Sequence, residues 1–219
     1  MAYSEVPSVS TGDLWTAANH NTYLRDNLID HETRILANAA SITTLQGTGT
    51  FLIEEQILST TSNLVTIDNI PQTYRNLNLI CDARIDLAGS ASVVKLLLNN
   101  DETNNAYGWQ YIQANNAGIS ADDYFGYEYM EIMKITASTA LANSSAYANI
   151  FIPNYAGTVF NKKTFTMNGL TLTSTEGGFY LASFAGNWFN ASAINRIDLI
   201  PWSNSNFITG STFSLYGIV

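Results

Sequence analysis

The chain has 219 residues, of which 46% are hydrophobic and 12% are charged, and its formal net charge is −9. This length fits a short arm with one substantial domain, and the hydrophobic fraction excludes wholesale disorder because it can form a buried core. Clustered lysine and arginine side chains are absent, so the composition argues against a nucleic-acid partner, and an anionic membrane would repel the acidic chain.

The single cysteine, Cys81, excludes an intrachain disulfide and lies in an apolar run, where we expect a buried and inert thiol. The first residues lack the basic and apolar regions of a secretory signal. No stretch approaches the ~20 apolar residues that cross a bilayer. We therefore expect synthesis in a reducing cytoplasm and no membrane insertion.

The first two predicted elements are an arm and a helix. Residues 1–12 predict an extended arm, since Pro7 and a run of Ser, Thr and Val give no helical period. Residues 13–46 predict a helix that Asp13 can cap. Uncharged residues recur along it at alternating spacings of three and four, which is the heptad pattern of a coiled coil. The predicted trimer-interface seam is Leu14, Ala17, Asn21, Leu24, Leu28, His31, Ile35, Asn38, Ile42 and Leu45.

Three seam positions are polar, namely Asn21, His31 and Asn38. In a trimer they would form polar layers at the threefold axis, which fix register and oligomeric state at a cost in stability. Alternatively, the helix is shorter or rotated and these side chains are exposed to solvent.

Residues 47–50 predict a hinge, because Gly47-Thr48-Gly49 breaks the helix. From residue 51 to 219 the hydrophobic period becomes two, and turn-forming clusters separate short strands. This pattern favours an antiparallel β-sandwich or jelly roll. The predicted strands are 51–58, 62–68, 74–85, 92–99, 107–113, 128–136, 145–152, 163–174, 178–185, 194–200 and 210–218.

Few residues in the sequence are suited to catalysis. Both histidines, His20 and His31, fall in the predicted helix, so a Ser–His–Asp, Cys–His or Cys/His zinc site within the sandwich is excluded by inventory. Phosphate-binding and dinucleotide-binding glycine motifs are also missing. We therefore expect a non-enzymatic protein without a cofactor or bound metal.

A paired-carboxylate site is the remaining catalytic alternative, because glycosidases need two acids at a suitable separation. The candidates Asp122, Asp123, Glu128 and Glu131 lie among aromatic residues. The competing interpretation, which we favour, is a solvated loop leading into an edge strand. Calcium binding at 101–102 or 122–123 is disfavoured, since neither pair resembles an EF-hand loop.

A candidate ligand face follows from the aromatic residues, since aromatic rings stack on sugars. Its members are Tyr107, Trp109, Tyr111, Tyr124 and Tyr127, the first three in alternating register. Packing in a core or subunit interface is the commoner role of such residues and remains the alternative.

Segments at both ends of the chain resemble small tailed-phage virion proteins. Residues 12–18 (GDLWTAA) and 21–28 (NTYLRDNL) are similar to the helix with which those proteins begin. Residues 70–77 (IPQTYRNL), 194–199 (INRIDL) and 210–217 (GSTFSLYG) resemble strands of their β-domain. The resemblance implies a homotrimer on the particle exterior and brings no catalytic residue.

Three functions follow from these expectations. The first is a capsid decoration (cement) protein on the virion exterior, whose partners are its own copies and the major capsid protein. The second is a tail-fibre or receptor-binding protein whose sandwich binds a host surface glycan or protein. A carboxylate-dependent polysaccharide depolymerase ranks third, because it needs converging acids for which the sequence offers only neighbours.

Overall fold

The computed structural model describes residues 17–46, 49–115, 117–173 and 178–219, leaving aside the side chains of 17–20, 23 and 40–46. The chain divides between Gly49 and Thr50 into two compact units, each described here by itself. The predicted arm 1–12 and the capping residue Asp13 lie outside the described residues.

The first unit contains α1 (Ala17–Gln46). The leucine and isoleucine side chains of α1 that the structure describes are more than half exposed, including Leu24, Leu28 and Ile35 of the predicted seam. A helix whose apolar side chains face water receives no stabilisation from packing, which is the main source of helix stability in proteins. No helix in the described part of the chain has the length and apolar character needed to cross a membrane.

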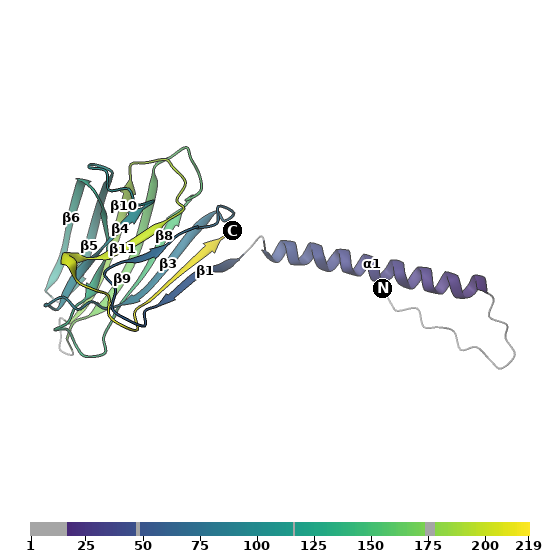
Figure 1. Cartoon of the computed structure of the whole chain (residues 1–219), viewed down its shortest axis with the longest axis horizontal. Helices are drawn as coiled ribbons and strands as arrows, with labels where there is room; N and C mark the ends of the chain where they lie inside the picture. Colours follow the sequence, from purple (N-terminus) through teal and green to yellow (C-terminus); the bar gives the residue numbers. More distant parts are fainter. Residues whose placement is uncertain (1–16, 47–48, 116, 174–177) are drawn as a thin grey trace. The chain divides into compact units, whose positions relative to one another are not determined.

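The second unit is an antiparallel β-sandwich, which confirms the predicted fold class (Figure 1). Its eight-stranded sheet has the order β1-β12-β3-β8-β9-β10-β5-β6, and its four-stranded sheet has the order β2-β11-β4-β7. The strands are β1 (Thr50–Ile57), β2 (Val65–Ile67), β3 (Asn76–Ala83), β4 (Ala91–Leu98), β5 (Tyr107–Asn115), β6 (Gly118–Tyr127), β7 (Met130–Thr136), β8 (Ala146–Pro153), β9 (Lys162–Thr171), β10 (Phe179–Trp188), β11 (Ile197–Pro201) and β12 (Thr212–Ile218), with a short 3₁₀ helix η1 (Trp202–Asn204).

The core lies between the two sheets and follows the predicted alternation. In β3, Leu77, Leu79, Cys81 and Ala83 are all buried and face the other sheet. Burial raises the pKa of the Cys81 thiol, because desolvation penalises the thiolate. The predicted inert cysteine is therefore a core residue.

One strand, β6, was not predicted. The structure extends β5 to Asn115 and pairs it with β6 from Gly118 onward, where the sequence suggested a loop. Residues such as Asp122 and Asp123 disfavour strands in general. They are tolerated here because β6 is the edge strand of the large sheet and most of its side chains are exposed.

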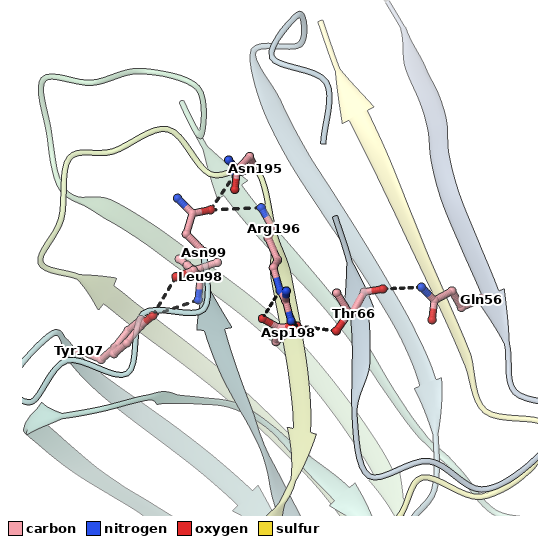
Figure 2. A network of polar contacts seen from close by, with 8 residues as sticks. All are labelled: Gln56, Thr66, Leu98, Asn99, Tyr107, Asn195, Arg196 and Asp198. Atoms are coloured by element: carbon pink, nitrogen blue, oxygen red, sulfur yellow. Dashed lines mark hydrogen bonds and ion pairs between the residues drawn. The ribbon is translucent and has the colours of Figure 1, made fainter. Parts of the chain in front are cut away.

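A polar network ties the two sheets together (Figure 2). Asp198, buried on β11, accepts hydrogen bonds from Arg196 Nε (2.8 Å to Oδ2) and from Thr66 Oγ1 on β2 (2.6 Å). The backbone carbonyl of Thr66 accepts a 2.6 Å bond from Gln56 Nε2 on β1 of the large sheet. The buried carboxylate is thus paired, as a buried charge must be.

Contacts join the three β-domain segments of the resemblance, or residues next to them, to one another. Gln72 Nε2 donates to the carbonyl of Ile194 (2.9 Å), and the Arg75 N–H donates to the carbonyl of Ile218 (2.8 Å). The ring of Tyr74 lies directly over Gly217, where any Cβ would overlap it. These segments hold the fold together, which gives their residues a structural role.

Candidate functional site: an aromatic cluster at the sandwich edge

The edge of the sandwich places part of the large sheet beside the last strand of the small one. Strands β5 and β6 end the eight-stranded sheet, and β7 ends the four-stranded sheet. Trp109 pairs with Tyr124 across β5 and β6, so the two side chains lie on the same face. Tyr129 lies in the turn that leads from β6 into β7.

These elements assemble six rings, which we call the aromatic cluster. Its members are Trp109, Tyr111, Tyr124, Tyr127, Tyr129 and Trp202. Trp109 stacks on Tyr124 with centroids 4.9 Å apart, and Tyr127 meets it edge-on at 4.8 Å. Tyr129 extends the cluster to Trp202 at 6.2 Å. Offset-stacked and edge-to-face contacts at these separations are mutually attractive.

Two lysines lie over the rings. Lys95 Nζ is 4.5 Å from the ring centroid of Tyr129 and 4.6 Å from that of Trp202. Lys134 Nζ is 4.6 Å from the centroid of Tyr111. These are cation–π distances, and the ammonium groups keep a polar surface beside the rings.

Glu131 adds a carboxylate to the same region. Burial raises the pKa of Glu131, while the charges of Lys134 and Lys95 act in the opposite direction. Burial also lowers the pKa of Lys134, opposed by Glu131. Charged groups of both signs are thus half-buried beside the rings.

The cluster is buried at its base and open at its margin. Trp109 is only 4% exposed, and its Nε1 has no hydrogen-bond partner among the described residues. Tyr127 and Trp202 are each 37% exposed. A buried indole N–H usually has a partner, so this donor marks a place where an acceptor would be stabilised.

The structure narrows the predicted ligand face. It brings Trp109, Tyr111, Tyr124 and Tyr127 together in the aromatic cluster. Tyr107 pairs with Tyr127 across β5 and β6, but its side chain lies in the core. Tyr107 is fully buried, stacks on Trp188 at 6.3 Å, and exchanges hydrogen bonds with the backbone of Leu98. Its ring is out of reach of a ligand because the core surrounds it.

Sequence reasoning missed Tyr129, Trp202 and the two lysines as neighbours of this face. Trp202 follows β11, far along the chain from β5, and only the sheet pairing brings it near Lys95. The alternation of β4 and β7 marks Lys95 and Lys134 as polar positions, but it does not indicate aromatic partners.

The two carboxylate candidates that are adjacent in sequence do not share a face. Asp122 and Asp123 are consecutive on β6, so they point to opposite faces of the sheet. Asp122 accepts a 3.0 Å hydrogen bond from the Tyr124 hydroxyl. Asp101 accepts a 2.7 Å bond from Trp188 Nε1, which gives it a structural role. No group of three potential metal ligands occurs among the described residues.

The helix seam lies on the other unit. Leu14 is outside the described residues, as are the side chains of Ala17, Ile42 and Leu45. The remaining seam residues, polar and apolar alike, are exposed: Asn21, Leu24, Leu28, His31, Ile35 and Asn38. Ile29 and Leu36, beside the seam, are exposed too. A single copy leaves this surface uncovered, and the trimeric coiled coil stays a prediction.

A scan of protein-family models gave no match to this chain, and a search of curated proteins gave none.

Proposed function

We propose that the chain is a non-enzymatic structural protein of a tailed-phage particle, a homotrimeric capsid decoration protein on the particle exterior. The observation that carries the proposal is the uncovered apolar surface of α1. Leu24, Leu28 and Ile35 are exposed in one copy, and helices from other copies would bury them. A protein that assembles through such a helix and displays a β-sandwich is suited to binding on the outside of a capsid shell.

The polar side chains of the sandwich support a structural role. Asp198, Asp101 and Asn99 are occupied by hydrogen bonds that join strands and turns. Asp122 and Asp123 point to opposite faces of the sheet, and Asp101 is hydrogen-bonded to Trp188. The partner that fits best is the major capsid protein, because the acidic trimer (3 × −9 = −27) disfavours nucleic acid and anionic lipid.

The aromatic cluster favours one second candidate, a tail-fibre or receptor-binding protein. Stacked rings with exposed margins, cationic groups beside them and a free buried donor suit a host surface glycan. Each stacked sugar would replace water on a ring face, and Glu131 would accept hydroxyl hydrogen bonds. In this alternative the trimer displays the cluster towards the host.

The test is binding of purified protein to capsids stripped of accessory proteins, with the mass of the free protein from light scattering. Saturable binding of a trimer, with greater capsid resistance to heat, would support decoration. A trimer that ignores capsids and adheres to host cells would move the assignment to the tail. Trp202→Ala should then weaken adhesion, whereas Leu64→Ala, at an exposed position outside the aromatic cluster, should not. A monomer that binds neither would refute both functions.

A further inference from the structure

The large sheet has a second exposed surface, on the side away from the core. We call it the outer apolar face. Its large side chains are Ile80, Ile112, Ile119, Tyr147, Phe151, Phe165, Met167, Phe179 and Leu181. They alternate along their strands with the buried residues, as at Phe165 and Met167 between Thr164, Thr166 and Asn168.

The strand register places these side chains in adjoining rows across the sheet. One row runs through Phe151, Phe165, Ala185 and Gln110. The next row passes through Ile80, Asn149, Met167, Ser183 and Ile112. A third passes through Tyr147, Gly169, Leu181, Ala114 and Ile119. Directly opposed residues lie ~5 Å apart, so the apolar groups form one continuous surface.

Charge is confined to the margins of this surface. Asp82 lies beyond Tyr147 on β3, and Asp123 lies beyond Gln110 on β6. Lys163 precedes Phe165 on the same face of β9. Between these positions the three rows contain only apolar and uncharged polar residues. An uncharged centre with a charged rim is the arrangement of protein interfaces.

The extent of the outer apolar face exceeds what a monomer leaves in water. Phe165 is 50% exposed, Met167 53% and Ile119 75%. With roughly 200 Å² for each large side chain, the exposed apolar area is on the order of 800 Å². The largest patch of a typical monomer is about 300–600 Å², and a standard interface buries about 800 Å² per partner.

The same face is hollowed. A depression of about 320 Å³ is lined by Gln110, Ile112, Ala121, Phe165, Ser183 and Ala185. Its lining combines small residues, Ala121, Ser183 and Ala185, with the larger Ile112 and Phe165. Such relief allows side chains of a facing surface to interdigitate, which close packing requires.

We propose that the outer apolar face is an interface between copies of this chain, so that the sandwiches pack together around the axis of the oligomer. The inference rests on the proposed homotrimer and identifies a surface for it outside the helix. A second copy fits because both surfaces are uncharged at their centres, so acidic chains can meet without burying acidic groups. The face also covers the area of an interface between subunits.

The first experiment compares variants by light scattering. Phe165→Lys with Met167→Lys puts two ammonium groups at the centre of the face, where a monomer would leave them solvated. The oligomer, then held by α1 alone, should dissociate at a protein concentration roughly tenfold higher than the wild type does, with the circular dichroism of the sandwich retained. The matched control, Leu64→Lys with Val159→Lys, changes exposed apolar residues outside the face and should leave the mass unchanged. A lysine variant that dissociates at the same concentration as the wild type would overturn the inference while leaving a helix-based trimer intact.

The second experiment needs no disruptive change. Met167→Cys places a thiol on the face, and the native Cys81 is buried and should not react. At concentrations where the protein is oligomeric, maleimide should label this thiol roughly tenfold more slowly than the thiol of Val159→Cys. Dilution to single chains should remove the difference. Equal rates in the oligomer, or protection in a monomer (which would mean that another part of the chain covers the face), would refute the inference. Neither readout depends on capsid binding. A failure of the proposed function can therefore be told apart from a failure of this inference.

Discussion

At the scale of single residues, Tyr107 shows how a hydroxyl can decide the role of an aromatic side chain. Its ring packs in the core against Trp188, and its hydroxyl accepts from the N–H of Leu98 (3.0 Å) and donates to the carbonyl of Leu98 (3.3 Å). Leu98 ends β4 beyond the last residue that pairs with β7, so its backbone N–H needs a partner on that side. Tyr107 supplies that partner.

Replacement of Tyr107 by phenylalanine should therefore destabilise the sandwich. The ring volume is nearly kept, while the buried N–H of Leu98 loses its partner, at a cost of about 1–3 kcal/mol. The carbonyl of Leu98 keeps a hydrogen bond from the N–H of Asp101 (3.1 Å). Urea unfolding followed by tryptophan fluorescence would measure the loss. Tyr147→Phe, which removes a hydroxyl from a half-exposed ring, is the matched control and should change little. Equal stabilities would show that the Leu98 backbone does not depend on Tyr107.

Glu131 makes the stability depend on pH. Burial raises its pKa above the ordinary value of 4.5, an effect that the nearby lysines reduce. The folded carboxyl therefore keeps its proton to higher pH than the unfolded one. Its favourable contribution is fully present below the unfolded pKa and is lost as the pH rises through the folded pKa.

The expected consequence is that Glu131→Gln raises the urea midpoint at neutral pH and leaves it nearly unchanged in acid, where the wild-type carboxyl is neutral too. Unfolding curves at both pH values measure the difference. Glu128→Gln, at an exposed position nearby, serves as the control. A Glu131→Gln variant that is less stable at neutral pH would mean that attraction to Lys95 and Lys134 outweighs burial.

At the scale of elements, the contact between Tyr74 and Gly217 joins the residues before β3 to β12. Tyr74 also stacks on Phe51 of β1, with centroids 6.0 Å apart. Gly217 pairs with Phe51 and with Leu77 in the sheet. The absence of a side chain at Gly217 lets the ring lie on the strand.

Gly217→Ala should displace Tyr74 and destabilise the sandwich by about 1–3 kcal/mol, because the added Cβ overlaps the ring and the packing must shift. Thermal or urea unfolding would measure the effect. Gly169→Ala is the control, since its nearest neighbour is 4.0 Å from the added carbon, and its stability should remain close to that of the wild type. A Gly217→Ala variant as stable as this control would show that Tyr74 moves without cost.

The sequence predicted those elements whose hydrophobic pattern can be recognised from neighbouring residues alone. The alternation from Leu77 to Ile85 gave β3, and the heptad spacing gave α1. Turn chemistry was also informative: Asn100 and Asn204, which fall between predicted strands, have positive φ, a conformation that asparagine tolerates well. Ile80 is an apolar residue on the side of β3 away from the core, where it belongs to the outer apolar face.

The parts of the fold and of the candidate site that were not predicted depend on contacts between segments distant in sequence. β6 was missed because its acidic residues suit an exposed edge and mimic a loop. The aromatic cluster was half predicted: the members on β5 and β6 are close in sequence, whereas Trp202 and Lys95 arrive through the pairing of β11 with β4. The outer apolar face was missed entirely, since its side chains come from strands whose order the sequence does not reveal.

At the scale of the whole molecule, the large sheet has two apolar sides. One side packs against the small sheet, and the other is the outer apolar face. The polar network of Asp198, Thr66 and Gln56 reaches from the small sheet to β1, which fixes the sandwich on one flank. The aromatic cluster lies at the opposite flank, beside β6. Assembly and ligand binding would thus use separate surfaces of one domain.

The position of β1 has a mechanical consequence. The chain enters the sandwich at Thr50, and β1 pairs in its sheet with β12 alone among the described strands. The C-terminal strand β12 (yellow in Figure 1) in turn pairs with β3. Tension applied through residues 1–49 therefore passes into the hydrogen bonds between the first and last strands of the domain. The hydrogen bonds of β12 are thus the contacts by which the sandwich would bear load.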